Sequence, residues 1–237
     1  MRVRPGAART VAVDGAPQLV PILVRALRAG GSPGAVVEGS LANAAILVWV
    51  GEPDEAKLRE ASIARIPIVA VTDADHVPYV LATDIVHVPA GQGFPTDAIA
   101  RVVARRLGDD APAIAAQLPG LRRAVVDALI EASARKNAVL AAGLVVPGVD
   151  MPVLTLAQVR LVMRIAQAYG LEVGRERALE VLGVVGAGFG LRALAREALD
   201  FVPVAGWALK GAIAYSGTKA VGEAARRYFE QSVRPGS

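Results

Sequence analysis

The run AILVWV, residues 45–50, decides the fold of the first half of this 237-residue chain. All six residues are apolar, and a second run, IPIVAV at residues 66–71, repeats the pattern after an amphipathic stretch. Continuous apolar runs are typical of strands covered on both faces, because a strand with one wet face alternates apolar and polar residues. Both runs therefore predict buried strands of a layered α/β domain.

Strands and helices are expected to alternate along residues 1–108. The expected strands are Thr10–Val13, Ala45–Val50, Ile66–Val71 and Asp84–Val88, and the expected helices are Pro17–Ala29, Asp54–Arg65 and Thr96–Leu107. Strands separated by helices of this length predict a parallel sheet.

The pattern changes at GDDAPAIAAQLPG, residues 108–120, which holds two Pro, two Gly and two Asp. We interpret residues 109–120 as a linker or short linker helix between an α/β domain (1–108) and an all-α domain (121–237). After it the periodicity is helical, with helices expected over Leu121–Val146, Thr155–Tyr169, Arg175–Asp200 and Val204–Glu230.

Composition favours closely packed helices and a cytoplasmic setting. Hydrophobic residues make up 54% of the chain but aromatic residues only 4%, and there is no cysteine for a disulfide or a thiolate metal site. The net charge of +4 is concentrated in the helical half. Because this half lacks the interleaving of aromatic with basic residues that base stacking would use, we expect an anionic membrane surface as its partner, and no nucleic acid.

The stretch GVVGAGFGLR, residues 183–192, raises the question of a phosphate-binding loop. A dinucleotide fingerprint needs GxGxxG between a strand and a helix, but here Leu191 stands at the third glycine and the preceding RERALEVL favours a helix. Small residues at helical spacing instead predict close helix packing or association. These residues are Gly183, Gly186 and Gly190, followed in the next helix by Ala208, Ala212, Ser216 and Ala220.

Basic residues bracket the short apolar segments of the helical half. The longest uncharged stretches, Asn137–Val149 and Val181–Leu191, are too short to span a bilayer. Charges beside such segments suit helices that lie in the headgroup region, although they also solubilise ordinary helix ends. The residues expected to face a membrane are Arg135, Lys136, Arg192, Lys210 and Lys219.

The helical half resembles the domain of unknown function of YcjF-type proteins, which is also fused to Era-like GTPases. Residues 121–230 carry the resemblance, at Pro147, Asp150, Gln158, Met163, Tyr169, Gly170, Pro203, Gly206, Thr218 and Gly222. The resemblance implies a membrane-associated protein that works beside a GTPase, and it implies no catalytic residue.

The first half is similar to a degenerate Ras-like GTPase domain. IPIVAVTDAD would stand where such a domain reads guanine, but of Asn-Lys-x-Asp only the final Asp75 is present. VAVDGAPQLV, residues 11–20, replaces the phosphate loop and has neither its lysine nor its hydroxyl residue, so phosphoryl transfer lacks its electrostatic clamp. Asp14, Gly15, Thr72 and Asp75 are retained as a weak candidate ligand site.

The sequence therefore predicts a non-catalytic, membrane-associated adaptor or scaffold with a GTPase-like α/β domain and a helical association domain. It would lie in the cytoplasm, peripheral to the inner face of the cell membrane, and bind a protein partner, such as a GTPase, or copies of itself. No catalytic residue, cofactor or metal is predicted. Two alternatives stay open: a nucleotide-dependent switch without standard motifs, and a wholly soluble helical scaffold.

Overall fold

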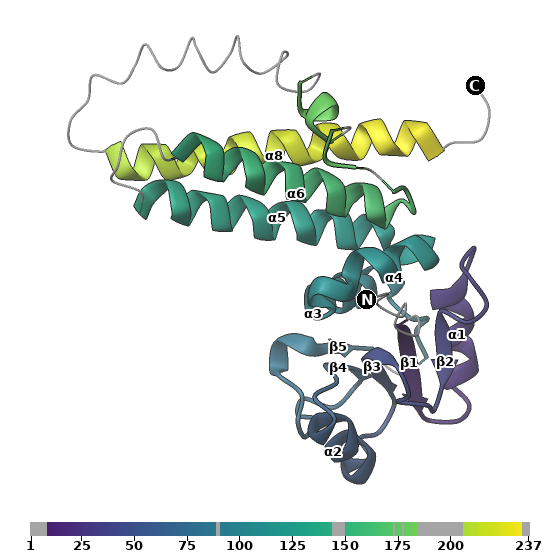
Figure 1. Cartoon of the computed structure of the whole chain (residues 1–237). Helices are drawn as coiled ribbons and strands as arrows, with labels where there is room; N and C mark the ends of the chain where they lie inside the picture. Colours follow the sequence, from purple (N-terminus) through teal and green to yellow (C-terminus); the bar gives the residue numbers. More distant parts are fainter. Residues whose placement is uncertain are drawn as a thin grey trace, which may run out of the picture. The chain divides into compact units, whose positions relative to one another are not determined.

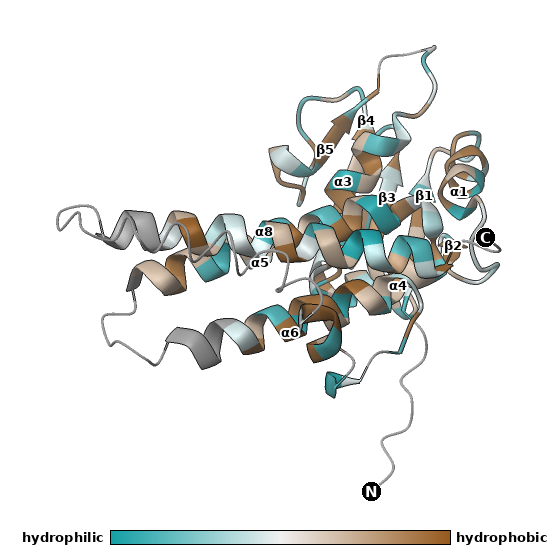
Figure 2. Ribbon diagram, turned by 90° about the horizontal axis from the view of Figure 1, so that it is seen from above, coloured by the Kyte–Doolittle hydropathy of each residue, from teal (hydrophilic) through white to brown (hydrophobic). Residues whose placement is uncertain are grey.

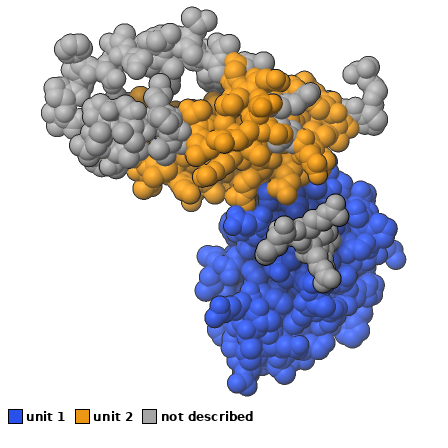
Figure 3. All heavy atoms as spheres, viewed as in Figure 1, with its two compact units in different colours: residues 1–125 blue, residues 126–237 orange. Residues whose placement is uncertain are grey.

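A computed structural model describes residues 9–88, 91–143, 150–172, 174–176, 178–183 and 206–233, and only the backbone of residues 143, 150–154 and 206–210. The chain divides into two compact units, Met1–Val125 and Val126–Ser237, which Figure 3 distinguishes by colour. Each unit is described by itself.

Unit 1 is built on a sheet of five parallel strands (Figure 1). The strands are β1 (Thr10–Gly15), β2 (Val36–Glu38), β3 (Ala44–Val50), β4 (Ile68–Thr72) and β5 (Ile85–His87). Their order across the sheet is β2-β1-β3-β4-β5, and each neighbouring pair is parallel. The predicted α/β class is thus confirmed.

Burial explains why the apolar runs become central strands. All seven residues of β3 and all five of β4 are buried, so neither strand has a wet face. Strand β2 was not expected, because three residues at the edge of a sheet carry no apolar run that periodicity could detect.

Three helices of unit 1 connect or follow the strands: α1 (Val20–Arg28), α2 (Glu55–Ile63) and α3 (Thr96–Arg106). The chain leaves β1 toward β2 through α1, but leaves β3 in the opposite direction, toward β4, through α2. Right-handed crossovers in opposite directions place α1 and α2 on opposite faces of the sheet. On the α2 face, Leu58 and Ala61 pack with Trp49 of β3 in one buried cluster.

Residues 109–120, expected as a linker or short linker helix, take part in folded structure. A short 3-10 helix, η1 (Ala82–Asp84), precedes β5. A second one, η2 (Gly108–Asp110), follows α3 and leads directly into α4 (Ala111–Gln117). Ile114 and Leu118 are fully buried. The amide of Ser32, between α1 and β2, donates to the Gln117 carbonyl at 2.9 Å, so this segment packs within unit 1.

The helical part holds α5 (Pro119–Gly143), α6 (Asp150–Ala168) and α8 (Gly206–Val233). Residues 178–183 are also helical. The expected all-α class of the second half is confirmed. Hydrophobic and hydrophilic segments alternate along these helices (Figure 2), and none of the helices in the described ranges is long and apolar enough to cross a membrane.

Candidate functional site

Two glycines of α8 bring its backbone against α5. A β-carbon at Gly222 would lie 2.6 Å from Ile130 Cγ1, and one at Gly211 would lie 3.2 Å from the Ala138 carbonyl oxygen. The approach at Gly222 is too short for a β-carbon unless Ile130 shifts, whereas at Gly211 a side chain would press on the backbone of Ala138. Since Gly222 faces Ile130 and Gly211 faces Ala138, the two helices run antiparallel.

A charged cluster spans the same pair of helices and is centred on Glu131 of α5. Its carboxylate accepts hydrogen bonds from Arg135 Nε at 2.7 Å, Tyr215 OH at 2.9 Å and Lys219 Nζ at 3.1 Å. Lys219 also lies 5.7 Å from the centre of the Tyr215 ring. We call Glu131, Arg135, Tyr215 and Lys219 the α5–α8 charge cluster.

These donors change the titration of the cluster. Hydrogen bonds from Arg135, Tyr215 and Lys219 stabilise the carboxylate and lower the pKa of Glu131 from 4.5 to about 2. The Glu131 carboxylate in turn raises the pKa of Lys219. Glu131 and Lys219 therefore both carry their charge at neutral pH.

A buried polar pair lies on the packed side of the same helices. Asn137 Nδ2 donates to Thr218 Oγ1 at 3.0 Å, and the threonine hydroxyl donates to the Ala214 carbonyl at 2.7 Å. Asn137 and Thr218 are each 1% exposed. Because a buried polar group without a partner is costly, this pair favours one register of α5 on α8.

Tyr169, which follows α6, joins that helix to the end of α8. Its hydroxyl donates to Glu230 Oε1 at 3.1 Å, and its ring lies 6.3 Å from that of Phe229. Tyr169 and Phe229 are both buried. The chain turns sharply after this anchor at Gly170, whose φ of +76° suits glycine.

The small-residue row predicted on α8 lies on the opposite side of the helix from the packed residues. Ala212 and Ser216 are exposed and Ala220 is half-buried, whereas Gly211, Thr218 and Gly222 are buried. Ala208 is in α8, where only the backbone is described. Gly183 is exposed, and no described atom lies within 4 Å of a β-carbon built on it. Gly186 and Gly190 lie outside the described residues.

The basic residues that were predicted to face a membrane lie in different settings. Arg135 and Lys219 belong to the charge cluster, and Lys136 is exposed on α5. Lys210 is in α8, in the part described by its backbone, and Arg192 lies outside the described residues.

The weak ligand site of unit 1 lies at the carboxyl edge of the sheet. Asp14 and Gly15 end β1 and Thr72 ends β4, on either side of β3. Thr72 is buried, and its hydroxyl accepts a hydrogen bond from the Ala74 amide at 3.2 Å. Asp75 is exposed beyond β4. The crossovers leave β1 and β3 in opposite directions, so the carboxyl ends of these two neighbouring strands form the switch point of the strand order. Open α/β sheets bind ligands at such a point.

The protein's own groups occupy this switch point. Lys57 Nζ lies 2.9 Å from Asp14 Oδ2, and the Gly15 amide donates to Asp14 Oδ1 at 2.8 Å. The Asp14 carboxylate raises the pKa of Lys57. Gly15 has a φ of +133°, and a β-carbon there would meet the Val50 carbonyl oxygen directly. The two strand ends thus touch, and their nearest charges are paired.

Sequence reasoning missed Glu131 and Lys57 as partners of charged residues that it did single out. Glu131 and Lys219 are 88 residues apart, and Lys57 is 43 residues from Asp14. One signal was available for Lys57: Asp54 is a helix-capping residue, and its side chain accepts from the Lys57 amide at 3.3 Å. That cap places Lys57 in the first turn of α2, directly beyond the carboxyl end of β3.

Comparison with known proteins places the helical part in a family. Residues 109–235 match a family described as a domain of unknown function, DUF697. No curated protein and no solved structure matches the chain. The match begins at η2 and includes α4, α5, α6 and α8, so the predicted likeness to a domain of unknown function is confirmed at that level. The match leaves out residues 1–108, whose GTPase-like character stays a prediction. Since more than half of the chain is matched, the protein belongs to the DUF697 family.

Proposed function

We propose that this protein is a non-catalytic, membrane-associated adaptor or scaffold. In this proposal unit 1, the α/β unit, binds a protein partner such as a GTPase. Unit 2, the helical unit, associates with an anionic membrane or with copies of itself. The observation that carries the proposal is the outer face of α8, which combines exposure with small, uncharged side chains.

A solvent-facing helix surface is normally polar and charged. The outer face of α8 instead displays Ala212 and Ser216, both exposed, with Ala220 half-buried one turn further on. Ile213 lies beside this row and is 45% exposed. Small side chains allow another backbone, or the lipid headgroup region, to approach α8 closely.

An apolar and basic surface on α5 supports the membrane part of the proposal. Val139 is 73% exposed, and the exposed side chains of Arg135 and Lys136 lie one turn before it. Residues three and four positions apart share one side of a helix. A cation near an anionic membrane contributes about 1 kcal/mol to the free energy of membrane binding. The side chain of Val139 would enter the headgroup region of the membrane beside these cations.

The carboxyl edge of unit 1 supports the non-catalytic part. An incoming phosphate would meet the Asp14 carboxylate, and the nearest cation, Lys57, is already paired with that carboxylate. Like charges repel strongly where water is partly excluded. This arrangement disfavours the alternative of a nucleotide-dependent switch.

Flotation of the full chain with liposomes of increasing anionic content tests the proposal. We expect the wild type to float with anionic vesicles. Lys136→Glu and Val139→Glu should each reduce flotation, because both residues are exposed and their replacement adds a negative charge. Arg59→Glu, at a site on α2 that is also exposed, is the matched control and should float like the wild type.

A wild type that stays out of every vesicle fraction would overturn membrane association. If that chain also sediments as a single monomeric species, the helical unit is a soluble scaffold and self-association fails as well. Ala212→Glu addresses the outer face of α8, where we expect it to reduce association and leave the melting temperature unchanged.

A further inference from the structure

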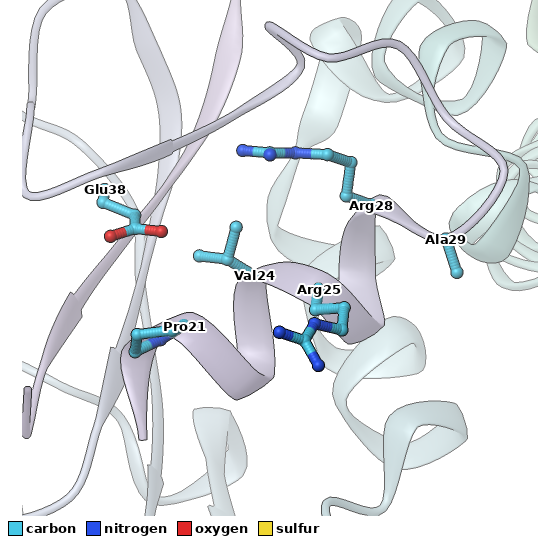
Figure 4. A pocket seen from close by; sticks show the side chains of 6 residues that line it. All are labelled: Pro21, Val24, Arg25, Arg28, Ala29 and Glu38. Atoms are coloured by element: carbon cyan, nitrogen blue, oxygen red, sulfur yellow. The ribbon is translucent and has the colours of Figure 1, made fainter. Parts of the chain in front are cut away.

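The outer edge of strand β2, which pairs with no further strand among the described residues, carries charges of both signs beside a hollow. Strand β2 ends the sheet, and α1 lies along it. Between them is a hollow of about 360 Å³ lined by Pro21, Val24, Arg25, Arg28, Ala29 and Glu38. Figure 4 shows Arg28 and Val24 extending toward the strand that carries Glu38.

Hydrogen bonding to β1 determines which backbone groups of β2 face outward. The Val11 amide donates to the Ala35 carbonyl, and the Gly39 amide donates to the Val13 carbonyl, both at 2.9 Å. Alternate residues of a strand direct their backbone groups to opposite edges. Val36 and Glu38 therefore direct their amides and carbonyls away from β1, toward the open edge.

Arg28 already reaches one of these groups. Its Nη2 donates to the Val36 carbonyl at 2.9 Å. Its Nε is buried and has no hydrogen-bond partner among the described residues. Glu38 is exposed and makes no ion pair with any described residue. The hollow at this edge is thus lined by two arginines, Arg25 and Arg28, and by a carboxylate that has no ion pair among the described residues.

We propose that this edge is a homodimer interface, in which β2 of one copy pairs antiparallel with β2 of a second copy. A patch that carries both charges complements itself under a two-fold axis, which is the commonest symmetry of protein dimers. The inference goes beyond the proposed function, since it concerns unit 1 and needs no lipid.

One register satisfies both the backbone and the charges. Val36 pairs with Glu38 of the second copy, and Glu38 pairs with Val36 of that copy, so that the outward amides and carbonyls exchange hydrogen bonds. The Val36 carbonyl, which accepts from Arg28, takes the amide of the second copy with its other lone pair. Residues opposite each other in an antiparallel pair have side chains on the same face, about 5 Å apart. Each Glu38 carboxylate then lies on the α1 side of the neighbouring copy, within reach of Arg28 and Arg25.

The same register gives the interface an apolar centre. Val37 falls on the two-fold axis, opposite Val37 of the second copy. Its side chain lies on the α2 face of the sheet and is half-buried in the monomer. On α1, Ile22 is 56% exposed next to Arg25 and adds apolar area at the rim. A short strand with this rim gives a small interface, so we expect a dimer that forms with rising concentration.

Sedimentation velocity of the full chain without lipid tests the proposal. We expect a concentration-dependent dimer in the wild type. Glu38→Pro removes an outward amide that does not bond to β1, so it should abolish the dimer with little effect on the monomer. Glu38→Arg should raise the dimer dissociation constant about tenfold or more, by placing like charges together.

Charge reversal makes the test specific. Combining Glu38→Arg with Arg25→Glu should restore the dimer, whereas Glu60→Arg, the same charge change on α2, should not alter it. Circular dichroism melting checks that each variant is folded. A monomeric wild type, a dimer that survives Glu38→Pro, or a double variant that stays monomeric overturns the proposal. Vesicle flotation reports on membrane association and Ala212→Glu reports on the α8 face, so a failure of the β2 interface is distinguishable from a failure of the proposed function.

Discussion

Gly222 of α8 lies so close to Ile130 of α5 that a β-carbon on the glycine would come within 2.6 Å of Ile130 Cγ1. The contact is between a backbone and a branched side chain that is only 1% exposed. Small changes at either residue should therefore be measurable in the stability of the helical unit.

Replacing Gly222 with alanine should destabilise the helical unit by about 1–3 kcal/mol, because the added methyl group overpacks the contact with Ile130. Urea unfolding followed by circular dichroism measures the change. Gly217→Ala is the matched control on the same helix: no described atom lies within 4 Å of its β-carbon position, and alanine favours a helix over glycine by up to about 1 kcal/mol. A stabilised Gly222→Ala variant would contradict the close contact.

The stability of the α5–α8 pair should fall as the solution becomes acidic below pH 4.5. The folded-state pKa of Glu131 is lowered to about 2, so its contribution is complete above the unfolded-state pKa and is lost as pH falls from 4.5 toward 2. Glu131→Gln should flatten this part of the stability curve.

Tyr215→Phe should shift the Glu131 titration upward, since it removes one donor and keeps the carboxylate. Carboxyl NMR resonances followed against pH report both effects. A Glu131 carboxyl that titrates near 4.5 in the wild type would show that the charge cluster does not form in solution.

The Asn137 and Thr218 pair should behave as one unit. Asn137→Ala and Thr218→Val each leave a buried partner group without its hydrogen bond, and each should lower the free energy of unfolding by about 1–3 kcal/mol. The double variant should cost less than the sum, because neither group is then left alone. Strict additivity in this cycle would rule out a direct bond.

Gly15→Ala should destabilise unit 1 by about 2 kcal/mol or more. Its φ of +133° is disfavoured for other residues, and the new β-carbon would meet the Val50 carbonyl oxygen. Gly34→Ala, where no described atom lies within 4 Å, should be close to neutral. Thermal melting of both variants decides the comparison, and equal melting temperatures would mean that the strand ends are less tightly joined.

Calorimetric titration with GTP and ATP should give no heat at millimolar nucleotide. The Asp14 carboxylate occupies the switch point and Lys57 is paired with it, which leaves no free cation there for a phosphate among the described residues. Saturable heat with either nucleotide would revive the nucleotide-dependent switch.

The sequence by itself determined the alternation of strands and helices in unit 1. The runs at residues 45–50 and 66–71 are apolar throughout, and only strands buried on both faces need that composition. It also determined that α8 carries small residues at helical spacing. It could not reveal β2, because a three-residue edge strand takes its conformation from pairing with β1.

Tertiary structure alone decided which face of α8 is packed. Gly211 and Gly222 lie on one side, Ala212 and Ser216 on another, and a period of about four residues fits both rows. Packing on Ile130 and Ala138 selects the first row, since side chains larger than glycine would press on α5 there. In the same way, the Glu131 carboxylate acquires three donors only when helices from distant parts of the sequence lie side by side, and local sequence patterns carry no information on such long-range contacts.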